Sequence, residues 1–268
     1  MTESSNVQSG QTRVIIVLPV YNEELHIAAL LGQIDDAIRR DALPYQVIAI
    51  DDGSDDGTSL ILETQSKRLP LTVYRHEINQ GLGRTIGDGL RIASKMASGH
   101  DAVITMDSDE THSPDLIARM VRMIQQGHDV VIASRYQPGA RVVGVSLLRR
   151  ALSYGASVLF RLVFPTRGVR DFTCGYRAYG GGTLHRAVAL FGDSFAATSG
   201  FECMVDILLT LRSLGVVFGE VPILLRYDLK QGASKMQIAR TIRRSLAVLA
   251  RHRFRGTLTG SVTEKPAG

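Results

Sequence analysis

The chain has 268 residues, of which 44% are hydrophobic and 21% charged, and it has two cysteines. This composition excludes a disordered chain and a disulfide framework, and the length allows a large core. The net charge of +5 hides an asymmetry. Residues 1–134 carry 11 basic and 19 acidic side chains (net −8), whereas residues 135–268 carry 20 and 7 (net +13). A charged partner such as a membrane surface or a nucleic acid is therefore expected.

The first half of the chain alternates strand and helix patterns. The polar residues 1–12 contain no secretory signal and are expected to be disordered. Continuous apolar runs, typical of strands buried on both faces, predict strands over 14–20, 46–51, 71–74, 102–106 and 130–133. Between them, helices are predicted over 23–40 (capped by Asn22), 58–68, 83–97 and 114–126. Units of this spacing predict an α/β fold with a doubly wound, mostly parallel sheet.

The second half is apolar and rich in arginine. The stretch 147–164 is interrupted by three arginines, so it cannot span a membrane. A helix end followed by a strand is predicted over 210–221. Over 236–255, apolar residues recur at helical spacing with arginines on much of the remaining surface, which predicts a basic amphipathic helix of the kind found at membrane interfaces.

Two acidic clusters follow predicted strands, where parallel sheets bind ligands. Asp107 and Asp109 could hold Mg²⁺ or Mn²⁺ against a diphosphate, or could simply be a solvated acidic loop. Asp52, in the turn over 51–58, could bond a base or a ribose, or could only shape the turn and cap a helix.

The order and spacing of these motifs resemble glycosyltransferase family 2, the inverting enzymes of the GT-A fold, across residues 13–136. The motifs that carry the resemblance are Leu18-Pro19-Val20-Tyr21-Asn22-Glu23-Glu24, Asp51-Asp52-Gly53-Ser54, Asp56-Gly57-Thr58, Asn79-x-Gly81-Leu82-Gly83, Asp107-x-Asp109 with His112, and Ser134-Arg135-Tyr136.

Motifs in the second half resemble the polyprenyl-phosphate hexose synthases, in particular the dolichol- and polyprenol-phosphate mannose synthases. These motifs are Arg149-Arg150-x-x-Ser153, Asp171-x-Thr173-x-Gly175-Tyr176-Arg177 and Gly232-x-Ser234-Lys235. The resemblance implies a GT-A domain over 13–230 with amphipathic interface helices at about 141–165. A basic amphipathic helix region over 231–256 and a disordered tail over 257–268 complete the expected organisation.

The resemblance also implies the donor and metal ligands. Residues expected to bind the nucleotide sugar are Pro19, Tyr21, Glu23, Asp52, Asp107 and Asp109. The metal, Mg²⁺ or Mn²⁺, is expected on Asp107, Asp109 and Thr111. Related synthases have Gln where this chain has Thr111, so Thr111, Glu110 or water could complete the metal shell.

The acceptor phosphate is expected to meet cationic and hydroxyl side chains, because arginine and lysine suit phosphate oxygens. The candidates are Arg135, Arg149, Arg150, Ser153, Arg226 and Lys235. Leu229 replaces a family arginine, and either Arg226 or Lys230 could supply the missing charge. Arg149 and Arg150 could instead be the solvated side of a helix, and Asp171 could pin its loop structurally.

The expected function is inverting transfer of a hexose to a polyprenyl or dolichyl monophosphate, with mannose from GDP-mannose favoured. Asp109, Arg135 and Lys235 are the expected catalytic residues, and no general base is needed because the acceptor is already anionic. The enzyme is expected to be peripheral on the cytoplasmic membrane face. Alternatives are a family 2 enzyme acting on a soluble acceptor and a non-catalytic membrane-surface scaffold. Nucleic-acid binding is disfavoured because the arginines are interleaved with apolar runs.

Overall fold

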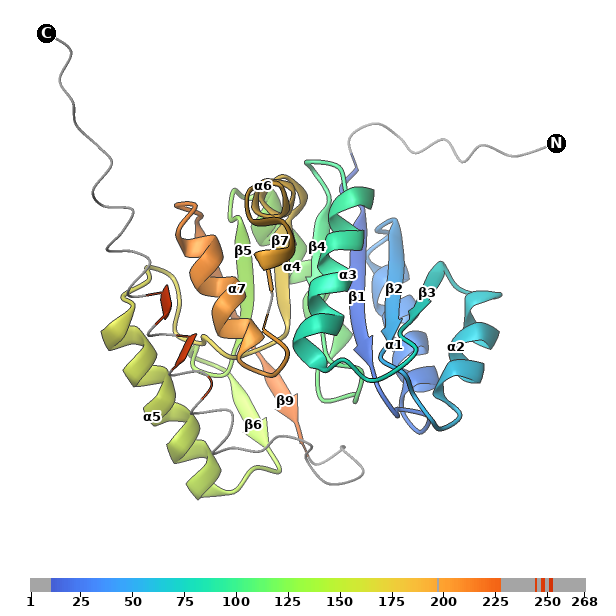
Figure 1. Ribbon diagram of the computed structural model, residues 1–268, viewed down its shortest axis with the longest axis horizontal. Helices are drawn as coiled ribbons and strands as arrows, with labels where there is room; N and C mark the ends of the chain where they lie inside the picture. Colours follow the sequence, from blue (N-terminus) through green and yellow to red (C-terminus); the bar gives the residue numbers. More distant parts are fainter. Residues whose placement is uncertain (1–10, 197, 228–243, 245–246, 249–250, 253–268) are drawn as a thin grey trace, which may run out of the picture.

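The computed structural model describes residues 11–196, 198–227, 244, 247–248 and 251–252 (Figure 1). Its centre is a seven-stranded sheet with the strand order β3-β2-β1-β4-β7-β5-β8. The strands are β1 (Val14–Val20), β2 (Tyr45–Asp51), β3 (Leu71–Arg75), β4 (Ala102–Thr105), β5 (Val130–Ser134), β7 (Arg177–Gly180) and β8 (Phe218–Pro222). Every pairing is parallel except those of β7, which runs antiparallel between β4 and β5. The mostly parallel α/β sheet is confirmed.

Helices cover both faces of the sheet, as the buried apolar runs of its strands require (Figure 1). In Figure 1, α3, α6 and α7 lie in front of the sheet, and α1 and α4 lie behind it. Their bounds are α1 (Ile27–Arg40), α2 (Thr58–Ser66), α3 (Leu82–Met96), α4 (Ile117–Gln125), α6 (Gly181–Phe191) and α7 (Cys203–Arg212). Two short 3₁₀ turns are Pro114–Leu116 and Gly192–Ser194.

A smaller unit lies beside the main sheet, below and to the left in Figure 1. It consists of the two-stranded parallel sheet of β6 (Arg141–Val143) and β9 (Leu224–Arg226), together with α5 (Leu147–Val163). The range expected to hold several interface helices therefore contains one helix, because residues 141–143 pair with β9 instead. Among the described residues, no helix combines the length and apolar character that a bilayer crossing requires.

The first predicted helix begins later than its sequence suggests. Asn22 does not cap it: its φ is 54°, and its side chain exchanges hydrogen bonds with Asp55. The helix begins at Ile27 because the preceding residues bond to the turn after β2.

Most of the helix expected over 231–256 lies outside the described residues. Of the part that the structure describes, His252 Nε2 lies 2.8 Å from Asp206 Oδ1 on α7.

The start of α3 is packed against a distant segment of the chain. The Gly83 N–H donates to the Ser199 carbonyl over 3.0 Å, and a Cβ at position 83 would overlap the Thr198 carbonyl oxygen. Gly83→Ala is therefore expected to lower the free energy of unfolding by about 1–3 kcal/mol, measured by urea denaturation. The control is Gly32→Ala in α1, where a Cβ meets nothing within 4 Å and a gain of up to about 1 kcal/mol is expected. Equal effects at the two positions would contradict the close-packing interpretation.

Candidate active site

The segments that carry the predicted donor and metal ligands and Arg135 converge at one edge of the main sheet. The parallel strands β1, β2, β4 and β5 all end at this edge, so the segments that follow them are brought together. The antiparallel strand β7 begins there, since Arg177 pairs with Thr105 at the end of β4. The segment 171–177 therefore lies at the same edge of the sheet as Asp107 and Asp109.

The loop after β1 is bonded to the turn after β2. The backbone N–H of Asn22 donates to Ser54 Oγ over 3.0 Å, and that of Glu23 donates to Thr58 Oγ1 over 2.9 Å. The Gly57 N–H in turn donates to the Glu24 carboxylate over 2.8 Å. Tyr21 and Glu23, two of the predicted donor-binding residues, are thus held on a fixed backbone and remain partly exposed.

Asp52 is buried and holds the loop that opens α3. Its carboxylate accepts hydrogen bonds from the backbone N–H groups of Gln80 and Gly81, each over 2.9 Å, and lies 2.7 Å from His76 Nδ1. Only 3% of the residue is exposed. The carboxylate therefore shapes the loop 79–81, and its role in nucleotide recognition stays a prediction.

Asp107 and Asp109 follow β4 directly, and their surroundings orient both of them. Asp109 Oδ1 accepts from the Thr111 hydroxyl over 2.6 Å and from the Thr111 N–H over 3.2 Å. The backbone N–H of Asp107 donates to His112 Nδ1 over 3.1 Å, and the His112 ring stacks on Tyr176. The intervening Ser108 hydroxyl donates to the Pro19 carbonyl over 2.8 Å, which ties this turn to β1.

The donor set of this turn fits a hard divalent cation. Carboxylate oxygens are the ligands that Mg²⁺ and Mn²⁺ prefer, and Mg²⁺ commonly binds through one or two carboxylates with substrate phosphates and water. Asp107 fits such a role because 41% of its side chain is exposed. In the part of the chain that the structure describes, no group of three or more His, Cys, Asp or Glu side chains forms a complete metal cluster. Two carboxylates with ligands from the substrate therefore match the residues present.

Glu110 points away from this pair. It has a left-handed φ of 58°, and its carboxylate contacts His26 Nδ1 at 3.0 Å and Gln33 Nε2 at 2.8 Å, both on the α1 side. Of the candidates for a third metal ligand, the structure therefore places Thr111 rather than Glu110 beside Asp109.

Arg135, after β5, is clamped by a buried carboxylate. Its Nε and Nη2 atoms donate to the two oxygens of Asp171 over 2.8 and 2.7 Å, and Nη2 also donates to Thr173 Oγ1. Burial raises the pKa of Asp171, but the charge and hydrogen bonds of Arg135 outweigh it and hold the pKa below its ordinary value. Among the described residues, Arg135 Nη1 makes no hydrogen bond, and the Arg135 side chain lines the adjacent cavity.

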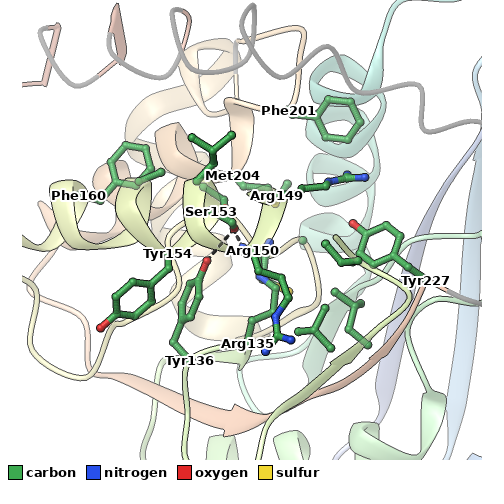
Figure 2. Close-up of a pocket in the computed structure, with 18 of the residues that line it drawn as sticks. Arg135, Tyr136, Arg149, Arg150, Ser153, Tyr154, Phe160, Phe201, Met204 and Tyr227 are labelled. Atoms are coloured by element: carbon green, nitrogen blue, oxygen red, sulfur yellow. Dashed lines mark hydrogen bonds between the residues drawn. The ribbon is translucent and has the colours of Figure 1, made fainter. Parts of the chain in front are cut away.

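A cavity of about 630 Å³ is lined by Asp107, Arg135 and residues of α5. Figure 2 shows the part of its wall around Arg135 and α5. Most of its lining is apolar and comes from α5, α3, α7, the β6–β9 unit and adjoining loops: Leu82, Ile86, Val142, Val145, Leu147, Leu152, Ala156, Leu159, Phe160, Phe201, Met204 and Leu225. Three arginines and several hydroxyl groups also line it. One cavity thus joins an acidic turn, a cationic wall and an apolar compartment.

The predicted acceptor ligands on α5 line this cavity. Arg149, Arg150 and Ser153 lie on the first two turns of the helix, and the Arg149 guanidinium lies 5.1 Å from the centre of the Tyr227 ring (Figure 2). Arg226 lies on β9, where its N–H donates to the Thr111 carbonyl over 3.3 Å. Lys230 and Lys235 fall outside the described residues.

Sequence reasoning assigned no role to Tyr136, Phe201 or Tyr227, which also line the cavity. For Tyr136 the available signal is its place directly after Arg135. Phe201 and Tyr227 lie far along the chain from the acidic turn, and no local pattern marks them.

The architecture has solved counterparts. Glucosyl-3-phosphoglycerate synthase from Mycobacterium tuberculosis, solved with Mn²⁺, UDP and glucosyl-3-phosphoglycerate, superposes with a TM-score of 0.65, covering 91% of this chain and 80% of that one. At 19% sequence identity, this likeness shows the fold, which is the GT-A fold.

The sequence comparisons identify the family. The family model described as "Glycosyl transferase family 2" matches residues 15–180. The undecaprenyl-phosphate mannosyltransferase of Micrococcus luteus is 32% identical over 226 residues, which is 84% of this chain and 87% of that protein. The polyprenol monophosphomannose synthase of Mycolicibacterium smegmatis is 28% identical over 249 residues, covering 92% and 89%. The chain belongs to glycosyl transferase family 2 and is a glycosyltransferase.

Proposed function

We propose that the protein transfers mannose from GDP-mannose to a polyprenyl monophosphate, with inversion at the anomeric carbon. The names of the two mannosyltransferase relatives support the sugar and the acceptor class. The observation that carries the proposal is the cavity, because its apolar compartment suits an isoprenoid chain and its arginines suit a phosphate (Figure 2). A soluble sugar or glycerate acceptor gives no reason for such an apolar compartment.

The reaction needs positioning more than proton transfer. A phosphate monoester is largely ionised near neutral pH, so its oxygen attacks the anomeric carbon without a general base. The bond between that carbon and the diphosphate oxygen breaks, and GDP leaves with the electron pair. Arg135 orients the attacking phosphate through Nη1 while Asp171 fixes its other edge. Arg149, Arg150, Arg226 and Lys235 are proposed to balance the remaining charge.

Asp107 and Asp109 are proposed to hold Mg²⁺ or Mn²⁺, with the Thr111 hydroxyl orienting Asp109. When bound, such a cation neutralises the negative charge that develops on the leaving diphosphate. Pro19, Tyr21, Glu23 and Asp52 are proposed to form the rest of the donor site, on the loops after β1 and β2.

We further propose that α5 docks the enzyme on the cytoplasmic face of the membrane. The helix exposes large apolar side chains, with Leu147 79% exposed and Leu162 74% exposed, next to Arg161. Apolar and basic side chains together suit a bilayer with anionic headgroups. Because Leu147 also lines the cavity, the exposed surface is continuous with the proposed acceptor site.

Product analysis tests the proposed function directly. The purified protein is incubated with Mn²⁺, a polyprenyl monophosphate and radiolabelled GDP-mannose or UDP-glucose. The products are extracted with organic solvent, and the mass of the extracted lipid is determined by mass spectrometry. Label in a lipid of the mass of polyprenyl-phosphate mannose is expected with GDP-mannose. Label transferred wholly to water-soluble products would contradict the lipid acceptor and favour the soluble-acceptor alternative.

The docking surface has its own test. Leu162→Glu is expected to weaken binding to phosphatidylglycerol-containing vesicles by about tenfold or more, since it removes an apolar anchor and adds a repelled charge. Co-sedimentation with vesicles measures the effect. The matched control is Leu60→Glu, because the Leu60 side chain on α2 is exposed to a similar extent (70%). Helix α2 lies at the opposite end of the main sheet from α5 (Figure 1). Equal losses in both variants would contradict docking through α5.

A further inference from the structure

A hydrogen bond between two side chains from different elements lies in the wall of the cavity. The Tyr136 hydroxyl, in the loop after β5, lies 2.8 Å from the Ser153 hydroxyl on α5 (Figure 2). The two residues are 17 positions apart and both line the cavity beside Arg135. The bond therefore links the loop after β5, which contains Arg135, to α5, which carries Arg149 and Arg150.

The Tyr136 ring is held in place independently of its hydroxyl. The Arg135 guanidinium lies 5.5 Å from the ring centre, and the Tyr154 ring packs edge-on at 5.8 Å. The Tyr136 N–H also donates to Ser134 Oγ over 3.2 Å. Removing the hydroxyl alone leaves these contacts intact, so its contribution can be isolated by a single substitution.

The chemistry of an anionic ligand sets the direction of this bond. A phosphate dianion offers only acceptor oxygens, so the one hydroxyl hydrogen of Ser153 has to point to the phosphate for the two to bond. The Ser153 oxygen then accepts from Tyr136, whose phenol is protonated near neutral pH and can donate. Burial raises the pKa of this phenol further. Without this donor, the serine is freer to take a rotamer that bonds the carbonyl four residues earlier in its own helix.

We propose that Tyr136 is a positioning residue that turns the Ser153 hydroxyl toward the acceptor phosphate. The chain of donors runs from the Tyr136 hydroxyl to the Ser153 hydroxyl and on to a phosphate oxygen. Each bond polarises the next, which strengthens the contact with the anion. The inference rests on the proposed function, since it specifies how that acceptor's phosphate is held.

The test is a double-mutant cycle of Tyr136→Phe and Ser153→Ala, measured as KM for polyprenyl phosphate and for GDP-mannose. Each single variant is expected to raise the acceptor KM about fivefold, the effect of one lost hydrogen bond, with the donor KM unchanged. In the Ser153→Ala background, Tyr136→Phe is expected to add nothing, because the group that it positions is gone. Tyr74→Phe, which alters an exposed residue on β3, is the control for loss of a tyrosine hydroxyl.

The outcomes separate this inference from the proposed function. An unchanged acceptor KM in Tyr136→Phe, or effects that multiply in the double variant, would overturn the positioning role while leaving lipid-phosphate mannosylation intact. A wild-type protein that does not use polyprenyl phosphate would refute the proposed function itself, and the inference with it. Thermal unfolding of each variant identifies any loss of activity that comes from misfolding.

Discussion

Asp109→Ala is expected to abolish sugar transfer, with kcat lower by about a thousandfold or more. Asp109 is only 7% exposed and is fixed by both the hydroxyl and the N–H of Thr111, so a water molecule cannot reproduce its position or charge. The second readout is calorimetric titration with GDP-mannose in the presence and absence of Mn²⁺. Donor binding that Mn²⁺ strengthens in the wild type is expected to lose that dependence in the variant.

The control for charge is Asp193→Ala, which removes an exposed carboxylate from the 3₁₀ turn after α6. Its turnover and its response to Mn²⁺ are expected to match those of the wild type. Near-normal turnover in Asp109→Ala would remove the proposed metal role of the acidic turn.

Asp171→Ala is expected to cost about 3–5 kcal/mol of unfolding free energy, a large share of a typical protein's stability. The carboxylate is fully buried and accepts two side-chain bonds from Arg135, together with backbone N–H bonds from Arg135, Thr173 and Cys174. Without this carboxylate, the mostly buried Arg135 guanidinium has no counter-ion, and the backbone N–H groups that bonded to Asp171 lose their acceptor. Urea denaturation followed by circular dichroism measures the loss.

Arg135→Met is the matched variant for this pair, and a smaller loss of stability is expected from it. Asp171 keeps its backbone N–H donors when the guanidinium is removed, whereas Arg135 has few other partners when Asp171 is removed. Both variants are expected to lose transfer activity. The opposite order of stability would show that the guanidinium, rather than the carboxylate, organises this loop.

Much of the main sheet could be predicted because the information is local. The apolar runs at 14–20, 46–51 and 130–133 contain enough β-branched and apolar residues to identify buried strands. Strand β7 could not be found this way, since Arg177–Gly180 is four residues long and contains no apolar run. The start of α1 was predicted too early because local preference for acidic residues in a first helical turn loses to tertiary bonds from the turn over 54–58.

The position of the acidic turn at the edge of the sheet was predictable because both aspartates closely follow a strand. The resemblance to known families also selected Arg135 and the α5 residues that line the cavity. The partners of these residues were not predictable. Asp171 lies 36 positions from Arg135, and Ser153 lies 17 from Tyr136, so only the folded chain shows which groups hold them.

The antiparallel strand β7 also limits how the molecule can move. Because β7 is hydrogen-bonded to β4 on one side and to β5 on the other, the strand preceding the acidic turn and the strand preceding Arg135 belong to one continuous ladder. The positions of the acidic turn and of Arg135 relative to each other are therefore set by the hydrogen bonds of the main sheet, and a hinge between them would have to break that ladder. Arg149, Arg150 and Ser153 lie on α5, outside the main sheet, so this ladder does not fix their distance from the acidic turn.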